Sequence, residues 1–550
     1  MLNGMQIFQL LILIMSIIIA VIKILNSNNI FKTNNKKDKN YTIEENIIDD
    51  KIEDSTNNQI VENYDLIIVG AGLSGLTTAY EASKLSDNSL KILLLEASSK
   101  YGGNSNNEID GINLLIPSDN EEFKNNDNFT CFFDDSFEFG RYESEKDLLT
   151  LLISNSYDLY DFLFNELNSY SLKLIKSEGS KVPRTLIYNN EEDEEEKITT
   201  GGYISNKLYN EIKNISSINI LFNSNFVDLI INKDYTEIQG VIYQIQKNYK
   251  IINVTAKSKV VILSTGGYGS DFYAEESLLK EFLVQYYHLP TICTKFTQGV
   301  GIKIGRNKGA VLIDQRQAEI YPTCFVDLSD RFNRHKIIAP DLFRELGGIL
   351  MNKRGKRFCN EISDRRFVGQ SILKNCDIVT DPNIIKQYEG FLIINEEIKE
   401  NYGEKINNYI SHGYLKKYES FDEFANAMKI SEYYTNIRKS IISYNQASNQ
   451  NMDTFGKGKF PTKFKMGDTI YVGVITPCIF HTLGGLRISE NAEVLNEEKR
   501  PIKGLYAAGQ IIGGIHGVMS MQGNILTQSV AFGRLAAKSA VNYIKKNNFS

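Results

Sequence analysis

The chain opens with an uncharged apolar run and continues with a polar stretch. Residues 1–22, MLNGMQIFQLLILIMSIIIAVI, carry no charged side chain, and lysines come next at positions 23, 32, 36, 37 and 39. A spanning helix needs roughly 20 apolar residues, and positive charge after the run places the rest of the chain on the cytoplasmic side. We therefore expect residues 1–25 to anchor the chain in the endoplasmic reticulum or another endomembrane. A cleaved signal peptide, leading to the secretory pathway or an organelle lumen, is the alternative.

The stretch from residue 26 to residue 60 is polar and has no apolar period, which predicts a flexible tether. Beyond it, short apolar runs alternate with glycine-rich turns. Leu66 to Val69 is the first run, KILLLE (91–96) is the second and KVVILS (259–264) is the third. Runs of this length are typical of buried parallel strands, and a helical pattern separates the first two. The pattern predicts an α/β fold with a Rossmann-like dinucleotide-binding domain.

The glycines after the first run match the G-x-G-x-x-G motif in its full strand–helix–strand context. In this motif the first glycine permits a tight turn, the second lets the backbone approach a pyrophosphate, and the third allows helix and strand to pack closely. The helix N-terminus faces the phosphates, and an acid at the end of the second strand binds ribose hydroxyls. The residues expected in these roles are Gly70, Gly72, Ser74, Gly75 and Glu96.

Three later segments favour FAD over NAD as the dinucleotide. They are YGGNSNNE (101–108), LSTGGYGSD (263–271) and GLYAAGQ (504–510). Their order is the pattern of two-domain FAD enzymes, in which the last segment brings the chain back to the flavin. We expect non-covalent FAD, with further contacts from Gly103, Asn104, Ser105, Gly267, Gly509 and Gln510.

Composition argues against several other functional classes. The 550 residues carry a net charge of −6, with an isoelectric point near 5.7, which argues against nucleic-acid binding. The six cysteines are far apart, without CxxC or CxxCH, so we expect reduced core thiols, no metal site and no covalent haem. The acid run EEDEEEK (191–197) predicts a solvated loop.

Longer segments resemble the FAD-dependent fumarate reductases, the family of soluble flavocytochrome and yeast-type enzymes. They are QGVGIKIGRNKGA (298–310), LFRELGGILMNKRGKRFCNE (342–361), HTLGGLRISENAEVLN (481–496), PIKGLYAAGQIIGGIHG (501–517) and GNILTQSVAFGRLAA (523–537). The resemblance implies a FAD-binding domain, residues 61–315 and 482–546, interrupted by a smaller α+β clamp domain, residues 316–481. The active site would lie between the two domains.

The resemblance also implies a reaction, in which reduced flavin gives a hydride to one carbon of an electron-poor double bond and an acid protonates the other. Arg365 matches the family's proton donor, and Arg344 and Asp341 match its proton relay. Aspartate replaces the family's glutamate, so we expect a water to complete the relay. The substrate-binding residues would be His481 and Thr482. The glycine-rich loop and helix start that cradle the flavin would include His516, Asn524, Ile525 and Leu526.

Three positions depart from the family. A histidine is replaced by Tyr321, an aspartate by Val300, and the arginine that grips a substrate carboxylate by Ser520. The substitutions to tyrosine at position 321 and to aspartate at position 341 resemble the urocanate reductases, which keep that arginine. Losing a bidentate arginine–carboxylate contact weakens binding by about 2–4 kcal/mol. We therefore expect Tyr321 and Ser520 to face a substrate whose second polar group is uncharged or aromatic.

The leading hypothesis is a monomeric FAD-dependent reductase of fumarate or a related enoate, a small unsaturated acid. Electrons would come from an external donor, such as a reduced flavin, a nicotinamide, a quinone or a redox protein. Two alternatives stay open: a flavin-dependent dehydrogenase of a saturated substrate, and an anchored flavoprotein without turnover.

Overall fold

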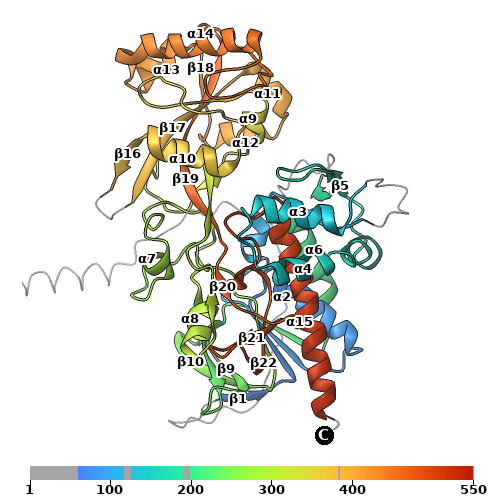
Figure 1. The fold of residues 1–550 in the computed structure, drawn as a ribbon. Helices are drawn as coiled ribbons and strands as arrows, with labels where there is room; N and C mark the ends of the chain where they lie inside the picture. The colour runs from blue at the N-terminus through green and yellow to red at the C-terminus, as the bar shows by residue number, and fades with distance from the viewer. Residues whose placement is uncertain (1–59, 117–125, 190–197, 382–384, 549–550) are drawn as a thin grey trace, which may run out of the picture. The chain divides into compact units, whose positions relative to one another are not determined.

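A computed structural model describes residues 60–116, 126–189, 198–381 and 385–548 (Figure 1). The expected anchor at residues 1–25 and the acid run at 191–197 lie outside the described residues, as does the expected tether apart from its last residue. Ile60 was placed in that tether, but it begins strand β1 (Ile60–Asn63), which pairs with a strand almost two hundred residues later. Residues 59–550 form one compact unit, so the division into a FAD-binding and a clamp domain stays a prediction.

A six-stranded sheet with the order β21-β22-β11-β2-β3-β7 lies at the centre of the dinucleotide-binding part. Strands β22, β11, β2, β3 and β7 are parallel, and β21 is antiparallel at one edge. Every residue of β2 and β3 is buried, as expected of strands covered on both faces. Their bounds are β2 Leu66–Val69, β3 Ile92–Leu95, β7 Ile218–Leu221, β11 Val261–Leu263, β21 Glu493–Leu495 and β22 Pro501–Ala507.

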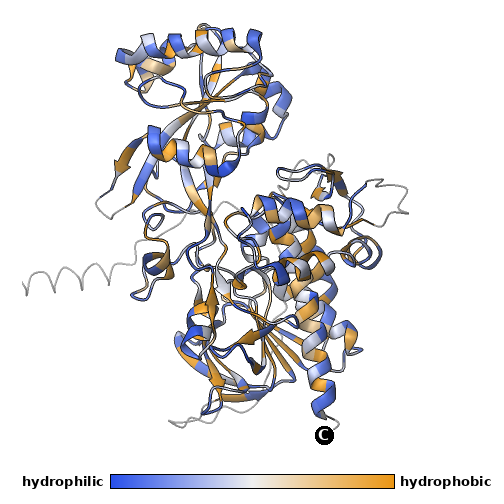
Figure 2. Cartoon of the chain, in the orientation of Figure 1, coloured by the Kyte–Doolittle hydropathy of each residue, from blue (hydrophilic) through white to orange (hydrophobic). Residues whose placement is uncertain are grey.

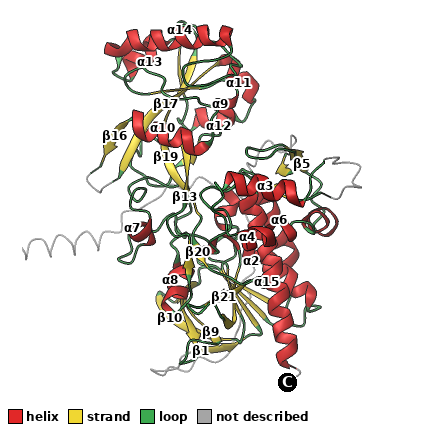
Figure 3. Cartoon of the chain, viewed as in Figure 1, coloured by secondary structure: helices red, strands yellow, loops and turns green. Residues whose placement is uncertain are grey.

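Three helices pack beside one another next to this sheet (Figure 3). Helix α2 (Leu73–Leu85) follows β2 directly, and the C-terminal helix α15 (Asn524–Asn548) and α6 (Thr200–Ile212) both pack on it. Gly533 of α15 leaves room for this contact, because a Cβ there would lie 2.8 Å from the backbone oxygen of Ser74. The alternation of parallel strands and helices confirms the expected α/β Rossmann-like class.

Smaller sheets and helices extend the dinucleotide-binding part. Strands β1, β10, β9 and β8 form one sheet, β4, β6 and β5 a second, and β12 and β20 a third. Their bounds are β4 Ile112–Asn113, β5 Leu172–Ile175, β6 Thr185–Tyr188, β8 Asn225–Ile231, β9 Ile238–Lys247, β10 Lys250–Lys257, β12 Leu312–Ile313 and β20 Gly485–Leu486. The helices are α3 Phe129–Phe139, α4 Lys146–Ser154, α5 Leu159–Asp161, α7 Leu278–Phe282 and α8 Val300–Asn307.

A seven-stranded antiparallel sheet organises the part of the chain between residues 318 and 482. Its path is β14-β13-β19-β17-β15, with β16 on β17 and β18 on β19. Its strands are β13 Ala318–Phe325, β14 Ile337–Ile338, β15 Ile349–Met351, β16 Asp377–Thr380, β17 Lys386–Asn395, β18 Lys416–Tyr418 and β19 Ile470–Thr482. Its helices are α9 Leu342–Glu345, α10 Arg365–Asn375, α11 Glu396–Tyr402, α12 Ile406–Ser411, α13 Phe421–Ala427 and α14 Tyr434–Gln450.

The buried apolar side chains form two large clusters and one small one among the described residues. One large cluster fills the dinucleotide-binding part, and the other surrounds β17 and β19. In Figure 2 hydrophobic residues predominate in the strands, whereas hydrophilic and hydrophobic residues alternate along α14. The small cluster, made of Tyr321, Cys324, Cys478 and Phe480, lies on the paired strands β13 and β19.

In the described part of the chain, no helix is both long enough and apolar enough to cross a bilayer. All six cysteines are free, and five of them are buried, in agreement with the expected reduced thiols.

Candidate active site

The glycine motif forms the turn that the sequence predicts. Gly70 has a φ of +105°, and a Cβ there would lie 2.4 Å from the backbone oxygen of Ser264. A Cβ on Gly75 would lie 1.8 Å from the oxygen of Gly70, so only glycine lets the helix start this close to the turn. A Cβ on Gly72 would meet only the oxygen of Gly102, at 3.8 Å, so its backbone faces open space.

This turn borders a cleft of about 1020 Å³, which we call the dinucleotide cleft. Glu96 lines it and is fixed by backbone N–H groups, because its two oxygens accept from Ala71 at 2.8 Å and from Ser98 at 2.7 Å. Gly266 also lines it, and a Cβ there would meet nothing within 4 Å. The predicted residues on its wall are Gly70, Gly72, Ser74, Glu96, Gly103, Asn104, Ser105 and Gln510.

The dinucleotide cleft therefore fits FAD on grounds of shape and donors. The N-terminus of α2 lies at the cleft, whose wall includes Gly72 and Leu73, and a helix N-terminus favours phosphate groups. The buried hydroxyl of Thr265, whose residue lines the cleft, has no hydrogen-bond partner among the described residues. Burial raises the pKa of Glu96, while the N–H groups of Ser98 and Ala71 oppose that rise.

A second cavity, of about 880 Å³, contains both Arg365 and Ser520 in its wall; we call it the Arg365 cavity. Residues from β13, from the start of α10 and from the segment 518–522 line it. The sequence predicts Arg365 and Ser520 in one site, and both residues line the Arg365 cavity. The acidic residues in the same wall, Glu178 and Glu319, were not anticipated.

Arg365 is held by two carboxylates. Its Nη1 and Nη2 each donate to an oxygen of Asp110 at 2.6 Å, and its Nε donates to Asp341 Oδ2 at 2.7 Å. Asp110 follows the segment that lines the dinucleotide cleft, so this ion pair joins α10 to the cofactor-binding part. Burial opposes the charged form of the guanidinium, but Asp110 and Asp341 more than compensate and hold the pKa of Arg365 well above its usual range.

Asp341 bridges the two arginines expected in the relay. Its Oδ1 accepts from Arg344, and its Oδ2 accepts from Arg365. The expectation that a water completes this link is wrong, because the short aspartate reaches both guanidinium groups directly. Burial would raise the pKa of Asp341, but the two arginines hold it below its usual range.

A buried ion network stands behind the relay. Arg344 also donates to the backbone oxygen of Glu361, four residues before Arg365. Glu361 accepts from Arg357 Nε at 2.7 Å and from Lys457 Nζ at 2.9 Å, and the side chains of Glu361 and Lys457 are fully buried. These contacts fix the segment that leads into α10 and so fix the position of Arg365.

Tyr321 lies under Arg365 and is not among the residues that line the Arg365 cavity. The Arg365 guanidinium stacks 4.7 Å from the centroid of the Tyr321 ring and 5.5 Å from that of Phe480. Tyr321 is fully buried, and its hydroxyl has no hydrogen-bond partner in the described part of the chain. The structure thus connects Tyr321 with the placement of Arg365 more directly than with a substrate.

His481 joins the two sites. Its Nδ1 accepts from Gln510 Nε2 at 3.1 Å, and Gln510 lines the dinucleotide cleft. Its Nε2 lies 3.0 Å from Glu108 Oε2. Burial, with a smaller effect from His516, lowers the pKa of His481 to about 3, so the ring is neutral near pH 7. The neighbouring Thr482 accepts the backbone N–H of Tyr268 at 3.0 Å, and a Cβ on Gly267 would collide with its hydroxyl.

Ser520 is buried, and its backbone N–H donates to Glu319 Oε1 at 2.7 Å. Glu319 on β13 is paired with His481 on β19, directly before a register shift. The position where the family carries an arginine therefore faces a carboxylate. Burial raises the pKa of Glu319 to about 8, although the N–H of Ser520 and the charge of Arg365 oppose the rise.

The segment around Ser520 is fixed at its C-terminal end. Asn113 Nδ2 donates to the backbone oxygen of Gln522 and to Asn524 Oδ1, both at 2.8 Å, and Asn524 Nδ2 donates to Ser136 Oγ at 3.1 Å. Asn524, Ile525 and Leu526 form the first turn of α15 and do not belong to the walls of either cavity.

At its N-terminal end, the same segment is fixed by His516. His516 Nε2 donates to Gln528 Oε1 at 2.7 Å, and Gln528 in turn donates to the oxygen of Gly509 at 2.9 Å. Gly509 has a φ of +78°, and a Cβ there would lie 2.4 Å from Ser74 Oγ. His516 therefore acts on the loop through Gln528, as a support for the turn that carries Gln510.

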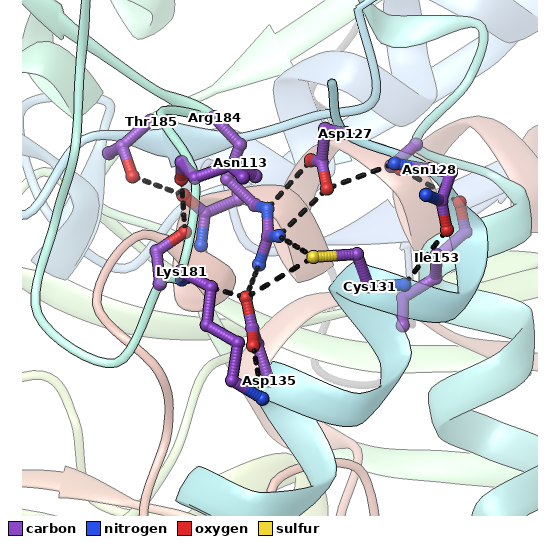
Figure 4. A network of polar contacts seen from close by, with 12 residues as sticks. Asn113, Asp127, Asn128, Cys131, Asp135, Ile153, Lys181, Arg184 and Thr185 are labelled. Atoms are coloured by element: carbon purple, nitrogen blue, oxygen red, sulfur yellow. Dashed lines mark hydrogen bonds and ion pairs between the residues drawn. The ribbon is translucent and has the colours of Figure 1, made fainter. Parts of the chain in front are cut away.

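A fully buried arginine, Arg184, packs beside this segment. Figure 4 shows its contacts with Asp127 and Asp135. Arg184 donates from Nε to Asp127 Oδ2 at 2.7 Å and forms an ion pair with Asp135 at 2.8 Å. It also lies 4.0 Å from the sulfur of Met521, and its guanidinium stacks on the Phe132 ring at 4.7 Å. Arg184 thereby ties α3 and β6 to the residue that follows Ser520.

Sequence reasoning missed Glu108, Asp110, Glu178 and Glu319, the carboxylates around the Arg365 cavity and His481. Only Glu108 falls in a segment that the sequence singled out, and the FAD contacts expected there were Gly103, Asn104 and Ser105. No local signal marks Glu319, because its place opposite His481 follows only from the pairing of β13 with β19.

The fold and the dinucleotide cleft define the class: a flavoprotein with a Rossmann-like FAD-binding domain. A family model described as "FAD binding domain" matches residues 65–526, and the chain belongs to this family. FAD is its cofactor, and the resemblance to FAD-dependent fumarate reductases found in the sequence is confirmed.

Curated relatives and a solved structure that resemble this chain are also fumarate reductases. The chain is 28% identical to "Fumarate reductase 1" of Saccharomyces cerevisiae, a match that covers 87% of this chain and 98% of that protein. It is also 28% identical to "Fumarate reductase" of Schizosaccharomyces pombe, over 88% and 90% of the two chains. The structure is similar to an open flavocytochrome c3 fumarate reductase, with a TM-score of 0.73, 24% identity and coverage of 88% and 79%. The chain is thus an FAD-dependent oxidoreductase of the fumarate reductase type.

Proposed function

We propose that this protein reduces an activated carbon–carbon double bond of a small unsaturated acid, with Arg365 as the proton donor. The observation that carries the proposal is the contiguous chain Arg344–Asp341–Arg365, which ends at the wall of the Arg365 cavity. The named relatives support fumarate or a related enoate as the substrate type.

Bound FAD would supply hydride in its reduced form. The protein supplies the rest. Three N–H groups of Arg365 are used by Asp110 and Asp341, and the remaining Nη–H groups are available for a substrate carbon. A proton lost from the Arg365 guanidinium is replaced from Arg344 by way of Asp341, and the direct contacts of Asp341 align both guanidinium groups before reaction. Neutral His481 donates or accepts a hydrogen bond without adding charge, and Tyr321 and Phe480 exclude water beneath Arg365.

Arg365→Ala tests the proposal. With reduced methyl viologen and a panel of enoates, we expect kcat to fall at least about a thousandfold, in line with the loss of a general acid. The flavin spectrum should remain, because Arg365 does not line the dinucleotide cleft. Arg438→Ala is the matched control, since Arg438 is exposed on α14 and makes no ion pair within the described residues. Turnover that survives in Arg365→Ala would exclude Arg365 as the donor.

The electron donor and the direction of the reaction are part of the proposal. Relatives of this type imply a small-molecule substrate and a redox partner. We propose reduction with electrons from an external reduced flavin, a nicotinamide, a quinone or a redox protein. Measuring the flavin midpoint potential distinguishes this from the dehydrogenase alternative: a potential far above that of the enoate couple would favour oxidation of a saturated substrate.

We also propose that residues 1–25 attach the chain to an endomembrane with the catalytic part in the cytoplasm, and that the protein is a monomer. Support comes from the uncharged run and the lysines after it. Membrane fractionation of the full chain beside a chain starting at residue 59, with protease protection of the membrane fraction, tests attachment and sidedness. Size-exclusion chromatography of the second chain tests the oligomeric state.

A further inference from the structure

The charges in the wall of the Arg365 cavity are not all paired. Arg365 is neutralised by Asp110 and Asp341, and Arg344 shares Asp341. Two positive and two negative groups therefore cancel within the relay. The remaining charged residues in the wall are Glu178, Glu319, Arg316 and Arg366.

Two of these are carboxylates near Ser520. Glu319 accepts one hydrogen bond, from the Ser520 N–H at 2.7 Å, through Oε1 alone. Its Oε2 has no hydrogen-bond partner among the described residues. The backbone N–H of Glu178 donates to Gln522 Oε1 at 3.1 Å, and the Glu178 carboxylate makes no hydrogen bond or ion pair within the described residues. A substrate carboxylate placed here would meet two carboxyl groups where the family has an arginine.

Two cations in the same wall are also without an ion pair in the described part of the chain. Arg316 lies two residues before β13, and Arg366 lies beside Arg365 at the start of α10. Both side chains are exposed, and neither reaches an acidic group of the protein. The cavity thus offers unpaired guanidinium groups and unpaired carboxyl groups to the same ligand.

A dicarboxylate would find arginine partners in this cavity for only one of its two carboxylates. One carboxylate can meet Arg316 or Arg366, but the other would lie against Glu319 with no arginine at position 520 to hold it. A ligand with one carboxylate and one N–H-bearing group would contact both the arginines and the glutamates, because each end then forms charge-assisted hydrogen bonds.

We propose that the substrate of this site is an unsaturated acid whose other end carries a protonated amine or another cationic N–H group, bound by Glu319 and Glu178. This inference rests on the proposed function for the double bond and deepens it by naming the substrate class. Glu319 is the specificity-determining residue, because its position is fixed by Ser520, and Glu178 adds a second acceptor.

The electrostatics of the site agree with this assignment. Burial raises the pKa of Glu319 to about 8, so its carboxyl binds a proton near neutral pH, and the pKa of Glu178, whose side chain is exposed, is shifted in the same direction. Arg365 opposes the rise at both residues, while Asp110 raises the pKa of Glu319 and Asp341 raises that of Glu178. A cationic ligand replaces the proton on Glu319. Its affinity should therefore increase as the pH rises from 6 toward 9, as long as its own amine stays protonated, whereas an anionic ligand should lose affinity.

The experiment measures binding to the oxidised holoenzyme, so that no turnover is needed. Three probes of similar length are titrated while the flavin absorption spectrum is recorded: trans-4-aminocrotonate, crotonate and fumarate. We expect 4-aminocrotonate to bind about tenfold or more tighter than either other acid at pH 8, the size expected for a charge-assisted contact. Equal affinities, or tightest binding of fumarate, would overturn the proposal.

Two variants assign the effect. Glu319→Gln should weaken 4-aminocrotonate about tenfold or more while changing the affinity for crotonate less than about threefold. Glu497→Gln, an exposed glutamate in the turn before β22, is the matched control and should leave all three affinities unchanged. Unchanged selectivity in Glu319→Gln would remove Glu319 from the site.

Binding and turnover separate this inference from the proposed function. If the selectivity appears but none of the three acids reoxidises the reduced flavin, the reductase proposal fails while the binding site stands. If fumarate or crotonate is reduced faster than 4-aminocrotonate and binds at least as tightly, the reductase proposal stands while this inference fails.

Discussion

Arg365 and Asp110, separated by 255 residues in the chain, form a bidentate ion pair with both N–O distances at 2.6 Å. The pair joins the first residue of α10 to the segment that leaves the dinucleotide cleft. It also occupies the donors that an anionic substrate would use. The same contact therefore positions the proposed proton donor and competes with acidic ligands.

Replacing Asp110 with asparagine tests this competition. In Asp110→Asn a negative charge disappears and the guanidinium becomes available, while Asp341 still holds Nε. We expect the KM for fumarate to fall about tenfold, equivalent to about 1.4 kcal/mol. Steady-state reoxidation of methyl viologen measures it. Asp234→Asn, an exposed turn residue, is the control. An unchanged or higher KM would show that Asp110 does not limit access to Arg365.

The glycine motif predicts a variant that loses the cofactor. In Gly75→Ala the new Cβ would lie 1.8 Å from the oxygen of Gly70, so the turn or α2 must shift, at a cost of about 3 kcal/mol or more. We expect the purified variant to contain little FAD, measured from the flavin absorbance per protein. Gly467→Ala provides the comparison, because a Cβ there meets nothing within 4 Å and φ is not positive. Full FAD content in Gly75→Ala would contradict the packing argument.

Much of the dinucleotide cleft could be predicted from local sequence, whereas the charges of the Arg365 cavity could not. The turn at Gly70, the helix that follows it and strand β3 before Glu96 lie within thirty residues and follow from the apolar runs and the glycine motif. Asp110 and Glu319 are distant along the chain from Arg365 and His481, and no local period marks them. Strand β19 is buried at all thirteen positions, so its pattern does not reveal which side chains face the site.

The role of Ser520 could also be predicted from the sequence only in part. Resemblance to the family identified the missing arginine, but it predicted only an uncharged partner for the substrate. The structure shows that Ser520 presents its backbone N–H to Glu319, so the site gains an ordered carboxylate where it loses an arginine.

His516 predicts a dependence of stability on pH. Burial lowers its pKa from 6.5 to about 4, so the unfolded chain binds a proton that the folded chain does not. The stability from neutral His516 is complete above pH 6.5 and is lost as the pH falls toward 4, by about 1.4 kcal/mol per pH unit. Glutamine can keep the donor to Gln528 without titrating.

Melting temperatures of His516→Gln and the wild type at pH 7.5 and 5.5 measure this effect. We expect the wild type to lose about 1–2 °C more than the variant over this range, given the size of the chain. His412→Gln is the control, because His412 is exposed and bonds only within its own helix turn and the adjacent Ser411. Parallel pH profiles for His516→Gln and the wild type would mean that His516 is not held neutral.

The buried ion cluster around Arg184 gives the last prediction. Arg184→Met leaves Asp127 and Asp135 without their shared partner in a fully buried position, which should lower the free energy of unfolding by about 3–5 kcal/mol. Adding Asp127→Asn and Asp135→Asn removes the unpaired charges, so the triple variant should recover at least half of that loss.

The free energies of unfolding of the single and the triple variant can be measured beside the wild type by the loss of flavin fluorescence quenching during denaturation. Because Arg184 lies against Met521, the single variant should also weaken the binding of small acids in the Arg365 cavity more than the triple variant does. A single variant as stable as the wild type would show that the cluster contributes no net stability. A triple variant less stable than the single one would show that the carboxylates contribute through other partners, such as the N–H and the ammonium group of Lys181, which both contact Asp135.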